Sequence, residues 1–195
     1  MVATVGAACI LLLAALGALA QEGADPAMHQ LPDDPQAVVV QWRSAGGQAE
    51  VAAGPDLTVR ADGTASVGPR LGHGRAVEGR ISQAELQDLL RFALDQNDFF
   101  AFDPGQVARQ LEAAGRERAA TGPGEAIAVP AGPPYVDAGT TTIRIAADGR
   151  RHEVGYHGLF AAAREHPENR PLAQLRAIEL RLLDLAQRIA AAAGD

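Results

Sequence analysis

Two Ala-Asp-Gly turns, each set between short runs of alternating apolar and polar residues, constrain the fold of this 195-residue chain more than any other feature. The first turn joins Leu57–Arg60 to 64–67, and the second joins 140–146 to 151–156. An Asp-Gly pair tolerates the positive φ angles of a hairpin turn, and alternation places apolar side chains on one face of a strand. The two segments therefore predict two antiparallel β-hairpins.

Two further segments have the composition of strands. Val38–Arg43 is rich in β-branched and aromatic residues and ends at the break formed by 44–47. Residues 76–80 follow a glycine-rich loop over 68–74 and form a third candidate strand beside the first hairpin. From these candidate segments, four to five strands are expected to join one antiparallel sheet.

Helix signals follow each hairpin. Ser82-Gln83-Ala84-Glu85 is a capping box, and Ile81 and Leu86 occupy the positions of a hydrophobic staple, so a helix is predicted from here to about Gln96. Further helices are predicted from the Asp103-Pro104 cap, over 158–165, and from Pro171 onward, and the three phenylalanines between the first two helices are expected in the core. The last helix carries one apolar stripe, formed by Leu172, Leu175, Ile178, Leu182, Leu185 and Ile189. The resulting fold class is α+β, with the helices packed mainly on one face of the sheet.

The order of elements shows a weak internal repeat. Residues 57–63 and 143–149 each lead a hairpin, and each hairpin precedes a leucine-rich helix. One interpretation is a single domain over 37–195 built from ββα halves, 37–120 and 136–195. The alternative is that Ala-Asp-Gly turns are common and the similarity is coincidental.

The N-terminal residues have the features of an export signal. Residues 1–20 carry no charge, include the apolar run 10–16, and end in Ala18-Leu19-Ala20, the small-x-small pattern that signal peptidase recognises. Cleavage is predicted after Ala20, followed by a flexible segment over 21–36, which leaves a periplasmic or secreted protein with no stable membrane span. Two alternatives remain: an uncleaved anchor, and lipidation at Cys9.

Charge and composition exclude several functional classes. The net charge is −7, and all 17 basic residues are arginine, with no basic stripe, so nucleic acid is not an expected partner. Cys9 is the only cysteine, so the mature chain would have no disulfide, no cysteine-ligated zinc and no thiolate nucleophile. A phosphate-binding loop of the Gly-Lys-Ser type is excluded because the chain contains no lysine.

No combination of residues commits the chain to a reaction. His152 and His157 are five residues apart, which places them on opposite faces of a strand, and His166 has no partner at helical spacing, so no metal site is predicted. His73 lies between two glycines, but no Gly-x-Ser-x-Gly elbow accompanies it. Asp95, Asp98 and Asp103 do not match a calcium loop. No catalytic, cofactor-binding or metal-binding residue is therefore assigned.

The large amphipathic aromatic side chains allow two interpretations. Trp42, Tyr135 and Tyr156 would mark a recognition patch if they were exposed together, and would belong to the core if they were buried singly. The core is the favoured interpretation for Trp42.

The segment from Val38 to Phe102, with its strand, Asp-Gly hairpin and Ser-x-x-Glu helix in that order, resembles uncharacterised bacterial secreted proteins. Residues 137–145, followed by Asp148-Gly149 and 152–154, resemble the same proteins. The resemblance implies an architecture and no activity. The expected function is a non-catalytic binding or structural module of the bacterial cell envelope, whose partner is another envelope protein or macromolecule. The alternatives are an enzyme whose site combines His73, His152 and His157 with carboxylates, and a periplasmic carrier of small ligands.

Overall fold

The computed structural model of the chain describes residues 28–46, 54–121 and 138–194. Several sequence-based predictions lie outside these residues. They are the signal over 1–20 with Cys9 and its cleavage after Ala20, the first part of the 21–36 segment, and Tyr135.

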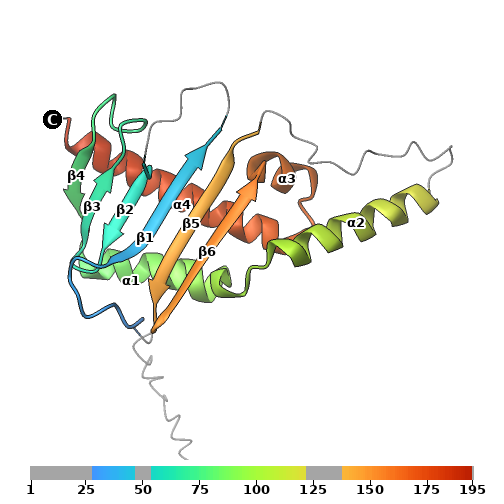
Figure 1. Cartoon of the computed structure of the whole chain (residues 1–195), viewed down its shortest axis with the longest axis horizontal. Helices are drawn as coiled ribbons and strands as arrows, with labels where there is room; N and C mark the ends of the chain where they lie inside the picture. The colour runs from blue at the N-terminus through green and yellow to red at the C-terminus, as the bar shows by residue number, and fades with distance from the viewer. Residues whose placement is uncertain (1–27, 47–53, 122–137, 195) are drawn as a thin grey trace, which may run out of the picture.

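Six strands form one antiparallel sheet in the order β4-β3-β2-β1-β5-β6 (Figure 1). The predicted α+β class with an antiparallel sheet is confirmed, with one strand more than the upper limit of the prediction. The strands are β1 (Val38–Ala45), β2 (Leu57–Arg60), β3 (Thr64–Val67), β4 (Val77–Arg80), β5 (Thr140–Ala147) and β6 (Arg150–His157).

The two Asp-Gly turns form different hairpins. Between β5 and β6, Asp148 and Gly149 both have positive φ angles, 55° and 67°, as a two-residue hairpin loop requires. Between β2 and β3 the loop has three residues, and only Gly63, with φ 82°, is left-handed. A Cβ atom at Gly63 would lie 2.4 Å from the carbonyl oxygen of Ile81, so this position also needs glycine for space.

The helices lie on one side of the sheet. Figure 1 shows the sheet turned towards the viewer, with α1 and α4 crossing behind it. The helical elements are α1 (Gln83–Arg91), which continues as the π-helical turn η1 (Phe92–Gln96), then η2 (Phe99–Ala101), α2 (Pro104–Thr121), α3 (Leu159–Glu165) and α4 (Arg170–Ala192). All six residues of the predicted stripe on α4 are buried against the sheet and α3. The prediction that the helices pack mainly on one face is confirmed.

The two hairpins occupy opposite sides of β1 in the sheet. The half over 37–120 contributes four strands and the half over 136–195 contributes two, all within one sheet and one hydrophobic cluster. The internal repeat thus covers one hairpin and the following helices of each half, and does not extend to β1 or β4.

The capping box at the start of α1 is present in full. The hydroxyl of Ser82 accepts a hydrogen bond from the backbone N–H of Glu85 at 3.2 Å, and the Glu85 carboxylate accepts one from the backbone N–H of Ser82 at 2.9 Å. This backbone hydrogen bond from Ser82 holds the pKa of Glu85 below its usual value. Ile81 and Leu86 are both buried, as a staple requires.

Ser82→Ala is expected to lower the free energy of unfolding by about 1 kcal/mol, because it removes the N-cap acceptor of α1. Chemical denaturation of the mutant and the parent would measure the difference. Ser66→Ala, which removes a hydroxyl from a partly exposed strand position outside any helix cap, serves as the control. Overlapping denaturation curves for Ser82→Ala and the parent would show that the cap contributes nothing to stability.

Candidate functional site

The side of the sheet away from the helices carries a continuous polar surface, which we call the open face. Trp42, Ile143 and Val154 are buried on the helical side, so strand alternation places the intervening residues on the other side. No described helix or strand covers this side. The open face consists of Val38, Gln41, Arg43, Ala45, Thr58, Arg60, Thr64, Ser66, Glu78, Arg80, Thr140, Thr142, Arg144, Ala146, Arg151, Glu153, Gly155 and His157.

Polar side chains form a row across all six strands of the open face. Register pairs connect neighbouring members of the row from one edge of the sheet to the other. The row is Glu78, Ser66, Thr58, Gln41, Arg144 and Glu153. With strands about 4.8 Å apart, it extends over roughly 24 Å. The open face is therefore a wide surface of hydrogen-bonding groups.

The charge of the open face is opposite to that of the whole chain. It carries five arginines and two glutamates, a net charge of +3, whereas the chain carries −7. Arg144 donates to Glu153 at 2.6 Å, and Arg60 donates to the carbonyl of Gln36 at 2.8 Å. Within the described residues, Arg43 and Arg151 form no hydrogen bond or ion pair through their guanidinium groups. Arg80 lies 4.0 Å from Asp62 of the β2–β3 turn, so its charge is partly compensated. Two cations of the open face, Arg43 and Arg151, are therefore uncommitted.

Gly155 leaves a gap in the open face near the β6 edge. It lies opposite Thr142, which in turn lies opposite Arg43. A Cβ atom built at Gly155 would meet nothing within 4 Å, so the backbone there is bare. Glycine inside a strand weakens it and often marks a place where a ligand or another backbone approaches closely.

A buried ionic group lies where β1 ends and β2 begins. The Asp56 carboxylate, only 7% exposed, accepts hydrogen bonds from the backbone N–H of Ser44 at 2.6 Å and from Nε of Arg70 at 2.8 Å. The hydrogen bond to Asp56 raises the pKa of Arg70 above its usual value, and Glu179 adds to this. The Arg70 guanidinium also lies 5.9 Å from the ring of Trp42. These contacts connect β1, β2 and the β3–β4 loop.

Glu179 of α4 is the second buried carboxylate of this region. Its Oε1 accepts a hydrogen bond from the hydroxyl of Thr141 on β5 at 2.5 Å, and its Oε2 is paired with Arg176. The Arg176 guanidinium lies 5.2 Å from the ring of the exposed Phe160. Each acidic group here is matched by an arginine and by hydrogen bonds, so the arrangement fixes α4 against the sheet rather than offering a free acid or base.

The N-terminal residues 28–30 are held against the domain by His29, which the sequence analysis did not single out. Its Nδ1 lies 2.8 Å from Asp148, its Nε2 lies 3.3 Å from Asp95, and Gln87 bonds both its backbone N–H and its carbonyl. Burial tends to raise the pKa of Asp148, but the hydrogen bonds from His29 and Gln30 lower it overall. No local pattern could reveal this contact, because His29 and Asp148 are 119 residues apart.

The structure does not bring His73, His152 and His157 together. His73 is exposed in the β3–β4 loop, and the other two lie on β6, at the opposite end of the strand order. His152 contacts the carbonyl of Phe102 at 3.1 Å on the helical side, whereas His157 lies 3.3 Å from Thr140 on the open face. The prediction that His152 and His157 lie on opposite faces is confirmed, and the three histidines named for the alternative site lie apart from one another.

The other residues singled out from the sequence have local roles. His166 lies 3.7 Å from Glu168, and Asp103 accepts a hydrogen bond from the backbone N–H of Gly105. Trp42 is 2% exposed, which confirms its assignment to the core. Tyr156 is half-buried on the helical side of β6, where burial raises its pKa. Trp42 and Tyr156 therefore do not form an exposed patch.

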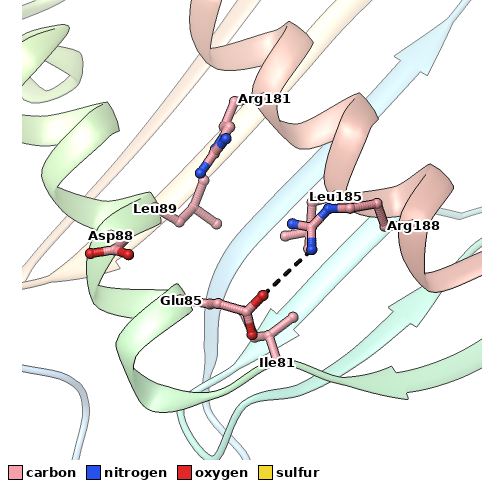
Figure 2. Close-up of a pocket in the computed structure, with 7 residues that line it drawn as sticks. All are labelled: Ile81, Glu85, Asp88, Leu89, Arg181, Leu185 and Arg188. Atoms are coloured by element: carbon pink, nitrogen blue, oxygen red, sulfur yellow. Dashed lines mark hydrogen bonds and ion pairs between the residues drawn. The ribbon is translucent and has the colours of Figure 1, made fainter.

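The hollows between α1, α4 and β4 are small or shallow. Figure 2 shows one of about 50 Å³ between α1 and α4, where Glu85 and Arg188 form an ion pair at 3.4 Å. This volume accommodates one or two water molecules and is well below the size of a typical ligand pocket. A more open hollow of about 270 Å³ adjoins it at Gly79 and Ile189. Neither contains a histidine or a free nucleophile.

Among the described residues, no set of three or more histidine, cysteine, aspartate or glutamate side chains is placed to hold a metal ion. No helix among those residues is long and apolar enough to cross a membrane.

Comparison with known proteins gives no match to a family model, to a curated protein or to a solved structure. The chemistry of the surfaces described above is therefore the basis for assigning a function.

Proposed function

We propose that the chain is an exported binding module of the bacterial cell envelope, and that its interaction surface is the open face. The main evidence is the difference in net charge, which is +3 on the open face and −7 on the whole chain. Such a contrast favours contact with an anionic partner, because complementary charge steers association and orients it. Export rests on the signal features of residues 1–20.

The open face also has the form expected of an interaction surface. It extends across six strands and presents hydroxyl, amide and guanidinium groups side by side. The buried charges of the domain, by contrast, are already paired with one another: Asp56 with Arg70, and Glu179 with Arg176. On the open face, Arg43 and Arg151 have no such partner among the described residues and are available to an anionic partner.

The double substitution Arg43→Glu with Arg151→Glu is expected to abolish binding of the envelope partner, because it reverses the two uncommitted cations of the open face. The purified protein would be immobilised, exposed to the envelope fraction of its own host, and its retained proteins and glycans quantified. Arg164→Glu with Arg181→Glu makes the same charge change on exposed helical positions and serves as the control.

Retention that is lost with the first double variant and kept with the second supports the open face. Equal retention by both variants, or equal loss, would overturn the proposal. Thermal denaturation of both variants would establish that each remains folded.

A further inference from the structure

The composition of the open face distinguishes between classes of anionic partner. It contains no phenylalanine, tyrosine, tryptophan, leucine, isoleucine or methionine side chain. Protein–protein interfaces are usually built around aromatic and apolar anchors, and single-stranded nucleic acids stack their bases on aromatic rings. The open face offers neither kind of contact, and its partner must be recognised through hydrogen bonds and charge.

The available hydrogen-bonding groups suit a chain that carries both hydroxyls and carboxylates. Ser66 and Gln41 lie in register on either side of Thr58, which is buried, and their side chains can donate and accept hydrogen bonds. Arginine binds a carboxylate through two parallel N–H donors, and Arg43 and Arg151 are uncommitted within the described residues. A sugar polymer with acidic units presents both kinds of group repeatedly.

An anionic bilayer is a less suitable partner for this surface than a linear polymer. At physiological ionic strength, charges are screened over about 8 Å, so any partner lying on the open face interacts mainly with its local charge of +3. Proteins that bind a bilayer surface also insert large apolar or aromatic side chains into it, and the open face lacks phenylalanine, tryptophan and leucine. A linear anionic polymer needs no such insertion.

At Gly155, a linear polymer can approach the sheet closely. Its bare backbone lies beside Thr142, with Arg43 on the far side of that residue and Arg144 and Glu153 on the neighbouring row. A polymer residue can rest here without meeting a side chain. The φ angle of Gly155 is not in the left-handed region, so the turn-forming property of glycine is not needed at this position.

From these observations we infer that the open face binds a linear acidic polysaccharide, whose carboxylates pair with Arg43 and Arg151 and whose chain passes over Gly155. This inference rests on the proposed function and names the class of its partner.

Gly155→Val is the sharpest test. A Cβ atom at position 155 would meet nothing within 4 Å, and valine is favoured in strands. The melting temperature of the variant is therefore expected to stay the same or rise. The added side chain covers the bare backbone, and affinity for polygalacturonate, measured by biolayer interferometry on the immobilised polymer, is expected to fall about tenfold. Arg43→Glu with Arg151→Glu is expected to remove the binding, and Arg164→Glu with Arg181→Glu to leave it unchanged.

Probes from other classes of macromolecule distinguish the polysaccharide inference from the proposed function. Neutral dextran, poly-glutamate, single-stranded DNA and vesicles with anionic phospholipids are all expected to bind more weakly than polygalacturonate. Equal or tighter binding of any of them would overturn the polysaccharide assignment, as would unchanged affinity in Gly155→Val. If polygalacturonate does not bind while the host partner is still lost with Arg43→Glu and Arg151→Glu, the inference fails and the proposed function stands.

Discussion

Phe99→Ala is expected to lower the free energy of unfolding by about 3–5 kcal/mol, the cost typical of truncating a buried aromatic side chain. Phe99 is 0% exposed and lies in the short helix η2, between the end of α1 and the start of α2. Its ring packs edge-on against His152 of β6, with the centroids 5.4 Å apart. Removing it leaves a cavity where the helical layer meets the sheet edge, and chemical denaturation would measure the loss.

The control for this prediction is Phe160→Ala. Phe160 is 59% exposed on α3, and its described ring contact is with Arg176. Its loss is expected to cost less than about 1 kcal/mol, the range of an exposed cation–π contact. Equal destabilisation by the two substitutions would show that Phe99 does not fill the core.

Asp56→Ala is expected to lower the free energy of unfolding by about 2–3 kcal/mol. The main cause is the backbone N–H of Ser44, which loses the acceptor that lies 2.6 Å away, because an unsatisfied buried donor is costly. Arg70 also loses its partner, but its side chain is 44% exposed and can be solvated, so this part of the loss is small. Denaturant titration at neutral pH would measure the change.

Asp56→Asn separates these two contributions. The amide oxygen can still accept from Ser44 while the charge opposite Arg70 is removed, so the loss is expected to be clearly smaller than for Asp56→Ala. Asp33→Ala, at an exposed position, is the control for removing a carboxylate from the surface. If alanine and asparagine at position 56 destabilise equally, the charge pair rather than the Ser44 hydrogen bond dominates.

Local signals predicted the elements of this fold well. The capping box at Ser82 and Glu85 marked the start of α1, because its atoms lie within one helical turn. The Asp148-Gly149 pair marked a hairpin turn because both residues adopt left-handed angles. The prediction of four to five strands fell short of the observed six because β1, β4 and the two hairpins all join one sheet.

The candidate surface was not predicted, although each of its residues is visible in the sequence. Arg43, Thr142 and Gly155 are distant in the chain, and only the pairing of β1 with β5 and of β5 with β6 places them in one row. The net charge of the whole chain, −7, conceals the local excess of arginine on this surface. Strand alternation shows which residues of each segment share a face, but only the order of the strands shows that these residues form one surface.

The sequence by itself determined the elements whose interactions are local: the hairpin turns, the cap of α1 and the apolar stripe of α4. Tertiary structure alone decided which strands are neighbours, and with that the open face, the Asp56–Arg70 pair and the contact of His29 with Asp95 and Asp148. The physical reason is the range of the interactions involved. Turn geometry, capping and helical periodicity act within a few residues, whereas burial of the apolar faces selects one arrangement of the whole chain and places distant polar groups together as a consequence.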